Sequence, residues 1–198
     1  MLKKDFLVAS LNESAQTKLD MIEACGDDIL AAINLFVESF KNGKKLLLCG
    51  NGGSAADCQH LATEFMIRLN HELNRPAIPA IALTTDTSNL TAGGNDIGFE
   101  NVFARNVEGL GNTGDLLMAV STSGNSGNVL KAVEKAKEKG MKVVGFLGGT
   151  GGKLKSMVDV AIVIPSNNVQ RIQEGHITAG HIIFELTELE LYSGKIKG

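Results

Sequence analysis

The sequence of 198 residues contains no tryptophan, one tyrosine and only three prolines. So few aromatic side chains leave little material for a platform on which nucleic-acid bases could stack. The net charge is −3 and no basic run stands out, which argues against a surface that binds nucleic-acid phosphates. The chain also lacks an apolar stretch that could span a membrane, and its N-terminus lacks the apolar core of a signal peptide. We therefore expect a cytoplasmic protein without nucleic-acid or membrane partners.

Cysteine occurs only as Cys25, Cys49 and Cys58, and the spacing matches neither a CxxC pair nor a zinc-finger pattern. Cys49 falls in an apolar run typical of a strand, and Cys58 falls in a helical pattern. We therefore expect buried free thiols, as in proteins of a reducing compartment, rather than disulfides.

Five short apolar runs alternate with helical patterns along the chain. The expected strands cover residues 45–49, 80–83, 116–120, 142–147 and 160–164. Such alternation predicts a parallel sheet with helices on both faces, which is the α/β class with a three-layer αβα sandwich. No linker or repeat divides the sequence, so we expect a single domain over residues 1–198.

Helical patterns also open and close the sequence. Residues 5–24 carry one apolar stripe, and Asp27 is placed to cap a second helix that ends near Gly43. We expect this pair of N-terminal helices, residues 1–43, to cover the sheet or to form a subunit interface. A long C-terminal helix is expected over residues 169–192.

A loop rich in hydroxyl groups, residues 121–128, joins the third expected strand to a helix that stops at Gly140. Hydroxyls and free backbone N–H groups at a helix N-terminus suit a phosphate. The loop lacks the lysine of a P-loop, so we expect a single phosphate on a small molecule rather than a nucleoside triphosphate with magnesium. The same residue types also suit helix capping and turn formation, and the loop alone does not decide between these roles.

A glycine-rich turn, residues 50–54, follows the first expected strand and mimics the dinucleotide-binding fingerprint. The acidic residue that this fingerprint requires about 20 residues later, at the end of the second strand, is missing, and the nearest candidate there, Asp86, lies 36 residues after Gly50. Asn51 and Ser54 instead offer polar groups that suit the hydroxyls or the phosphate of a sugar. A second glycine pair precedes residues 95–96 and can either bring backbone close to a ligand or form an ordinary turn.

Two helices carry candidate chemical groups. His60 and Glu64 lie one turn apart, so they share a face of the helix that follows the glycine-rich turn. Such a pair can chelate a metal, can act as acid and base, or can be a solvated polar pair. The final helix adds Gln173 and His181, which point about 80° apart around an ideal helix.

Four motifs run in order along nearly the whole chain: CGNGGSAADCQHLATEF, GND at residues 94–96, STSGNS and RIQEGHITAGH. With them the sequence resembles the sugar isomerase (SIS) domain family, which implies a flavodoxin-like five-stranded parallel sheet between helices. It is most similar to members that convert sedoheptulose 7-phosphate to D-glycero-D-manno-heptose 7-phosphate through an enediol, toward the heptose of bacterial lipopolysaccharide. Gly175 and Gly180 replace bulkier apolar residues of relatives, so we expect this helix to pack differently.

The resemblance also implies roles for individual residues. Glu64 and His181 match the catalytic acid–base pair. The residues that match substrate contacts are Asn51, Gly52, Gly53, Glu64, Asn95, Asp96, Ser121, Thr122, Ser123, Ser126 and Gln173. The residues that match a zinc site, with one ion per subunit, are His60, Glu64, Gln173 and His181. The family is typically a homotetramer whose active sites draw on more than one subunit.

Two other functions remain open. Some SIS proteins bind a replication initiator or sense phosphosugars without turnover, and such relatives tend to lose the acid–base residues. Glu64 and His181 are both present here, which favours an enzyme. The other candidate is isomerisation of a pentose 5-phosphate or a hexose 6-phosphate, against which the length and the absence of an added domain argue.

Overall fold

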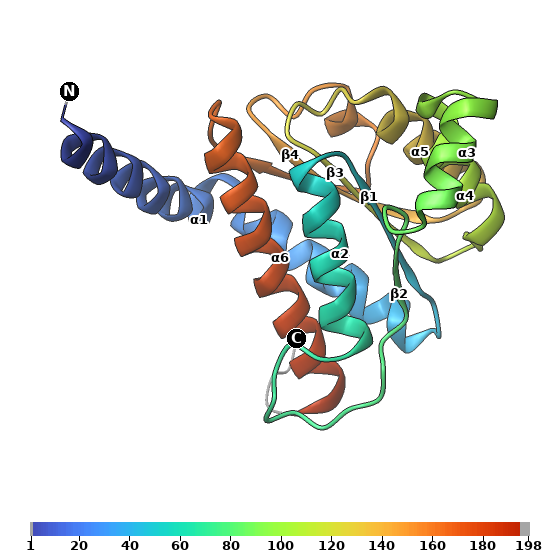
Figure 1. Cartoon of the computed structure of the whole chain (residues 1–198). Helices are drawn as coiled ribbons and strands as arrows, with labels where there is room; N and C mark the ends of the chain where they lie inside the picture. Colours follow the sequence, from blue (N-terminus) through green and yellow to red (C-terminus); the bar gives the residue numbers. More distant parts are fainter. Residues whose placement is uncertain (1, 195–198) are drawn as a thin grey trace.

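Five parallel strands form the centre of the molecule, and helices cover both faces of this sheet (Figure 1). The computed structural model describes residues 2–194. The strands lie in the order β2-β1-β3-β4-β5. They are β1 (Leu46–Gly50), β2 (Ala80–Ala82), β3 (Leu116–Ser121), β4 (Lys142–Gly148) and β5 (Val160–Ile164). The predicted five-stranded parallel sheet is therefore confirmed.

The helices form the two outer layers of the sandwich. They are α1 (Lys3–Lys41), α2 (Gly53–Met66), α3 (Thr87–Asp96), α4 (Val102–Leu110), α5 (Gly127–Glu138) and α6 (Val169–Tyr192), with short 3-10 helices η1 (Phe99–Asn101) and η2 (Lys153–Ser156). Leu46 and Leu48 of β1 pack into a core with side chains of α1, α2 and α6. Leu47 and Cys49 point to the other face and pack with α4 and α5. Burial on both faces explains why each strand is a nearly continuous apolar run.

The N-terminal segment is one continuous helix, α1, where the sequence predicted two helices with a cap at Asp27. Gly26 at the predicted break costs about 1 kcal/mol relative to alanine inside a helix. Cys25 and Ile29, on either side of it, are buried in the core. The burial of both side chains offsets the cost of the glycine, so the helix continues through residues 26–27 instead of ending there.

The two halves of α1 have different surroundings. Its second half covers the sheet with buried side chains that include Ile29, Ile33 and Phe36. Its first half projects away from the body of the molecule (Figure 1). The apolar stripe predicted for residues 5–24 lies there and is exposed, with 62% of Leu11 and 66% of Ile22 accessible. The N-terminal segment was expected to cover the sheet or to form a subunit interface. The second half of α1 covers the sheet.

The connection after β2 contains a helix that the sequence did not predict. Residues 84–98 are polar and rich in threonine, asparagine and glycine, and α3 occupies Thr87–Asp96 within them. The Asp86 side chain accepts a hydrogen bond from the Asn89 backbone N–H at 2.9 Å, as an N-cap does. None of the α3 residues is buried, so the helix has no apolar stripe from which it could have been predicted.

The two glycines of α6 allow close packing against its neighbours. A Cβ atom at Gly175 would lie 2.7 Å from the Ile164 side chain, and one at Gly180 would lie 2.8 Å from the Leu61 side chain. Real Cβ atoms do not approach so closely. These glycines therefore bring α6 directly against β5 and α2.

The three cysteines are free and buried, as predicted. Burial raises the pKa of the Cys49 thiol to about 12, so this thiol stays protonated at neutral pH. Among the helices of residues 2–194, none combines the length and the hydrophobicity that crossing a bilayer requires.

Candidate functional site

The glycine-rich turn after β1 and the hydroxyl loop after β3 lie next to each other at the carboxyl edge of the sheet. β1 and β3 are paired neighbours, and the chain leaves β1 toward β2 on one side and reaches β3 on the other. This reversal of strand order makes the pair a topological switch point, where parallel α/β sheets bind ligands. The fold therefore brings the two predicted ligand loops to one place.

The hydroxyl loop, residues 121–126, is held in shape by its own side chains and by the turn after β4. The Ser121 and Ser126 hydroxyl oxygens lie 2.9 Å apart, at hydrogen-bond distance. The Asn125 amide donates to the Ser123 carbonyl at 2.9 Å and accepts from the Lys153 backbone N–H at 3.1 Å. Gly124 has φ of +64°, and a Cβ atom there would lie 1.9 Å from the Gly151 carbonyl oxygen. The loop is thus fixed by close backbone packing that only glycine permits.

A hollow of about 280 Å³ opens beside this loop, lined by Thr122, Ser123, Gly148, Gly149, Thr150, Asn167, Val169 and Ile172. Helix α5 begins at Gly127, directly after the loop, so its unpaired backbone N–H groups lie at the loop's end. Hydroxyl groups beside a helix N-terminus and an open hollow can together hold a phosphate.

An amide pair joins the glycine-rich turn to the first turn of α5. The Asn51 amide donates to the Asn128 side-chain oxygen at 2.9 Å, and the Asn128 amide donates to the Asn51 oxygen at 2.8 Å. Asn128 is buried and Asn51 is half-buried. Asn128 belongs to the polar segment predicted from the sequence, residues 121–128, but it was not among the predicted site residues. Its partner Asn51 lies 77 residues away, so no local pattern indicates the pairing.

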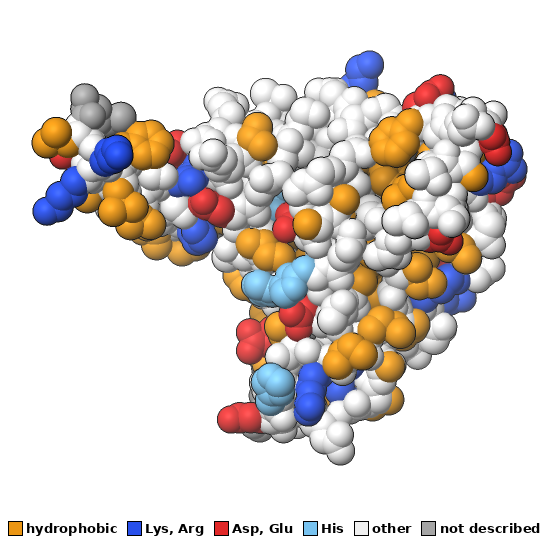
Figure 2. Space-filling model, in the orientation of Figure 1, with side chains coloured by type: hydrophobic (Ala, Val, Ile, Leu, Met, Phe, Trp, Pro, Cys, Tyr) orange, Lys and Arg blue, Asp and Glu red, His pale blue; other side chains and the backbone are white. Residues whose placement is uncertain are grey.

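His60, Glu64 and His181 come together from α2 and α6. The His60 and His181 Nε2 atoms lie 2.8 Å apart, and His60 Nε2 lies 3.3 Å from Glu64 Oε1. One nitrogen or oxygen atom of each residue lies within 4.8 Å of the corresponding atoms of the other two. Figure 2 shows histidine side chains gathered on the surface over these helices, and 47% of the His60 side chain is accessible.

This cluster fits a divalent metal of the zinc type. Two imidazole nitrogens and a carboxylate oxygen are donors that zinc prefers. Two nitrogens bound to one tetrahedral zinc lie about 3.3 Å apart, since each bond is about 2.0–2.1 Å long. The 2.8 Å between the histidines is close to this value, so a small side-chain movement would create the ligand arrangement.

The other predicted site residues lie at the ends of neighbouring helices. The Gln173 amide packs on Gly53 at the start of α2, where a Cβ atom would lie 2.4 Å from its nitrogen. Asn95 and Asp96 lie exposed at the end of α3, and the Asn95 amide donates to the Asp96 carboxylate at 2.7 Å. Their contacts to substrate and the ligation of metal by Gln173 stay predictions.

Asp57 is a residue of this region that sequence analysis missed. It lies on α2 one turn before His60, and burial raises the pKa of its carboxyl group, while the electrostatic influence of His60 and His181 lowers it. Its Oδ2 atom is buried without a hydrogen-bond partner among the described residues. The helical spacing of residues 57, 60 and 64 on one face was the signal that could have identified it.

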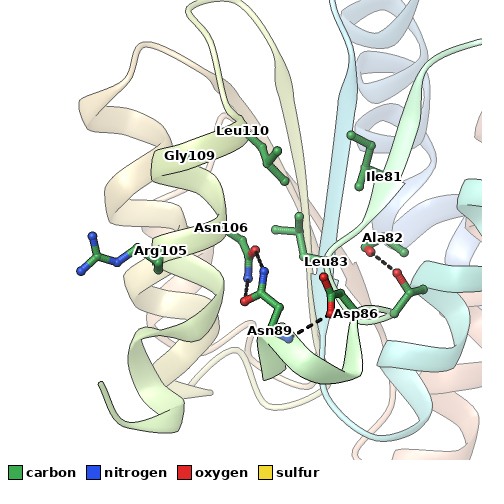
Figure 3. A pocket seen from close by; sticks show the side chains of 10 residues that line it. Ile81, Ala82, Leu83, Asp86, Asn89, Arg105, Asn106, Gly109 and Leu110 are labelled. Carbon is green, nitrogen blue, oxygen red and sulfur yellow. Dashed lines mark hydrogen bonds between the residues drawn. The ribbon is translucent and has the colours of Figure 1, made fainter. Parts of the chain in front are cut away.

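A separate hollow of about 470 Å³ lies between β2, α3 and α4 (Figure 3). Asn89 of α3 and Asn106 of α4 both line it and exchange amide hydrogen bonds of 2.7 and 3.3 Å with each other. None of the residues predicted to bind substrate or metal lines this hollow. The candidate functional site therefore consists of the switch point and the cluster on α2 and α6.

Residues 11–148 match the family described as the SIS domain. A phosphoheptose isomerase of Chlorobaculum parvum is 53% identical over 176 residues, which cover 88% of this chain and 84% of that relative. A phosphoheptose isomerase structure from Francisella tularensis has a TM-score of 0.90 and 38% identity, covering 95% of this chain and 99% of that chain. The corresponding structure from Neisseria gonorrhoeae has a TM-score of 0.87 and 39% identity, covering 94% and 98%.

Proposed function

The chain belongs to the SIS domain family, and we propose that it is a phosphoheptose isomerase, an enzyme that interconverts sedoheptulose 7-phosphate and D-glycero-D-manno-heptose 7-phosphate. The observation that carries this proposal is the gathering of His60, Glu64 and His181 into one cluster, in a chain 53% identical to a phosphoheptose isomerase over 176 residues. The product supplies heptose biosynthesis, and the heptose of bacterial lipopolysaccharide is the destination that we propose.

The hydroxyl loop binds the substrate phosphate in this proposal. Ser121, Thr122, Ser123 and Ser126 surround the position at the start of α5 where a dianion is stabilised by the helix dipole. Asn51, Gly52 and Gly53 contact the sugar from the glycine-rich turn, whose shape the amide pair with Asn128 maintains. Asn95, Asp96 and Gln173 complete the substrate contacts.

The reaction moves one proton between two neighbouring carbons. Glu64 removes a proton from C1 of the ketose, which gives an enediol, and returns a proton to C2, which gives the aldose. His181 moves a proton between the oxygens on C1 and C2, since an imidazole both accepts and donates protons near neutral pH. Both side chains lie within the cluster that spans less than 5 Å, so they can act on adjacent atoms of one substrate.

Zinc is the metal that we propose for this cluster, one ion per subunit. His60, Glu64 and His181 would hold it, with Gln173 as the fourth ligand. When bound, zinc supplies Lewis-acid polarisation of the substrate carbonyl. A carboxylate bound to metal is a weaker base, so Glu64 acts as the base when its carboxylate turns from the cluster toward the substrate.

A homotetramer in the cytoplasm is the form of the protein that we propose. The exposed stripe on the first half of α1 supports self-association, because Leu7, Leu11, Leu19 and Ile22 are each more than half accessible. An apolar groove between α1 and α6, lined in part by Met21, Ile29 and Ile182, continues this surface. The buried free thiols support a reducing compartment.

The direct test is turnover of purified protein, supplied with zinc, on sedoheptulose 7-phosphate, followed by NMR for the aldose. Fructose 6-phosphate and ribulose 5-phosphate, tested at the same concentrations, report selectivity for the seven-carbon sugar. Formation of the aldose from the heptulose at a higher kcat/KM than from either shorter ketose is the expected result. Binding of the heptulose phosphate without turnover would contradict the proposal and would indicate a phosphosugar-binding protein.

A further inference from the structure

Arg75, in the loop between α2 and β2, is a buried charged residue outside the site described above. Its guanidinium group donates to the Glu64 carbonyl at 2.8 Å and to the Phe65 and Pro76 carbonyls at 2.9 Å each. Glu64 and Phe65 belong to the last turn of α2, where carbonyl groups lose their partners within the helix. Arg75 therefore closes the end of the helix at the residue that carries the proposed base.

The charge of Arg75 is matched by a carboxylate from α6. The guanidinium donates to Glu188 at 2.8 Å, and only 1% of each side chain is accessible. Among the described residues, Nε of Arg75 and Oε1 of Glu188 have no hydrogen-bond partner. Because burying two charges is unfavourable unless they are fully paired, an ion pair of this kind is weak evidence for a role in stability alone.

The ion pair lies at one end of the contact between α2 and α6, and the proposed catalytic pair lies further along it. Glu188 is seven residues after His181, about two helical turns, so both project from the same face of α6. The rings of Phe65 and Phe184 stack between them, with centroids 3.9 Å apart and planes 13° apart. Figure 1 shows the two helices side by side over this length.

We propose that Arg75 is a positioning residue, which holds the end of α2 against α6 through Glu188 and thereby sets the position of Glu64 relative to His181. This inference rests on the proposed function, because it assigns Arg75 to the same proton transfer. Arginine suits the role because its planar fork of N–H groups reaches the helix carbonyls and a carboxylate at once. A lysine ammonium has three donors on a single atom and cannot span these acceptors in the same way.

The test compares Arg75→Lys, Arg75→Met and Glu188→Gln with wild type, at a temperature at which thermal unfolding shows every variant folded. We expect kcat to fall at least tenfold in Arg75→Met and less in Arg75→Lys and Glu188→Gln, with KM within threefold. We expect little change in KM because the hydroxyl loop, which binds the phosphate in the proposal, follows β3 and not α2 or α6, the helices that the Arg75–Glu188 pair joins. Lys45→Met is the matched control, since Lys45 makes a separate ion pair, with buried Asp115, between the amino ends of β1 and β3.

A second readout separates this inference from the proposed function. Zinc affinity, measured by competition with a chromophoric chelator, needs no substrate and reports the arrangement of His60, Glu64 and His181. We expect it to weaken at least fivefold in Arg75→Met and to be unchanged in Lys45→Met.

If wild type has no isomerase activity but the variants lose zinc affinity, the proposed function fails and the positioning role stands. Variants with wild-type kcat and wild-type zinc affinity, whatever their melting temperatures, would overturn the positioning role. Wild-type protein without turnover and without zinc affinity would overturn both proposals.

Discussion

The Nε2 atoms of His60 and His181 lie 2.8 Å apart, although the two residues are 121 positions apart in the sequence. Two neutral imidazoles at this distance can share a hydrogen bond, and a metal ion between them needs only slightly more room. We expect His60→Ala to weaken zinc affinity at least tenfold, because it removes one of the three clustered donors. Chelator competition measures the affinity, and His71→Ala is the control because His71 is exposed and outside the cluster. Equal zinc affinity in His60→Ala and wild type would place the metal elsewhere.

The phosphate site makes a prediction about KM. Removing the hydroxyls of Ser123 and Ser126 together should raise KM by at least about a hundredfold, because each of the two lost hydrogen bonds to a charged group contributes about 1.5–3 kcal/mol. Steady-state kinetics with sedoheptulose 7-phosphate measure the effect. Ser156→Ala serves as the control, because it removes a hydroxyl of η2 that donates to the Lys153 carbonyl. A KM that is unchanged in the double variant would move the phosphate to another part of the molecule.

His176 makes a prediction about stability and pH. It is buried, its Nε2 lies 2.9 Å from the Leu147 carbonyl oxygen, and burial lowers its pKa from 6.5 to about 4. Between these pH values the unfolded chain binds a proton that the folded chain excludes, so stability falls as pH drops from 6.5 toward 4. The loss is on the order of 3 kcal/mol, since each pKa unit corresponds to about 1.4 kcal/mol.

The variant that tests this prediction is His176→Gln, which keeps an amide donor for the Leu147 carbonyl and does not titrate. Its free energy of unfolding, measured by urea denaturation at several pH values, should depend less steeply on pH between 4 and 6.5 than that of wild type. His71→Gln, with an exposed side chain, should retain the wild-type slope. Identical slopes in all three proteins would show that His176 accepts a proton in the folded state.

The exposed half of α1 makes a prediction about assembly. Leu11→Glu places a charge on the apolar stripe, where 62% of Leu11 is accessible in the single chain. We expect the proposed tetramer to dissociate into smaller species, detected by light scattering after size-exclusion chromatography, while the circular dichroism spectrum keeps its helical content. Asn12→Glu adds the same charge at an exposed polar position and should leave the mass unchanged. A wild-type mass for Leu11→Glu would exclude the stripe from the interface.

The sequence predicted the parts of the fold that depend on local patterns. Each strand is an apolar run buried on both faces, so its position could be predicted to within two residues. The continuity of α1 could not be predicted, because the packing that offsets Gly26 depends on side chains buried far along the chain. Helix α3 escaped prediction because none of its residues is buried.

In the candidate site, too, local spacing predicted some residues, whereas contacts between distant segments could not be predicted. His60 and Glu64 could be paired from helical spacing alone, whereas His181 came from the resemblance to the family and from its place on the final helix. The pairs Asn51–Asn128 and Arg75–Glu188 join positions 77 and 113 residues apart, and neither partner has a sequence signal for the other. Such contacts follow from the order of the strands and from the packing of α2 against α6, which the sequence pattern does not specify.

The central claim is that Glu64 transfers a carbon-bound proton through an enediol. The most direct measurement is isomerisation of sedoheptulose 7-phosphate in D2O, with NMR detection of deuterium at C2 of the aldose, for wild type and for Glu64→Gln. We predict deuterium at C2 with the wild type, and at least a thousandfold slower formation of aldose and deuterated sugar with Glu64→Gln, which keeps the shape of the side chain but not the base. Aldose formed by Glu64→Gln at the wild-type rate and with the wild-type deuterium content at C2 would contradict the account.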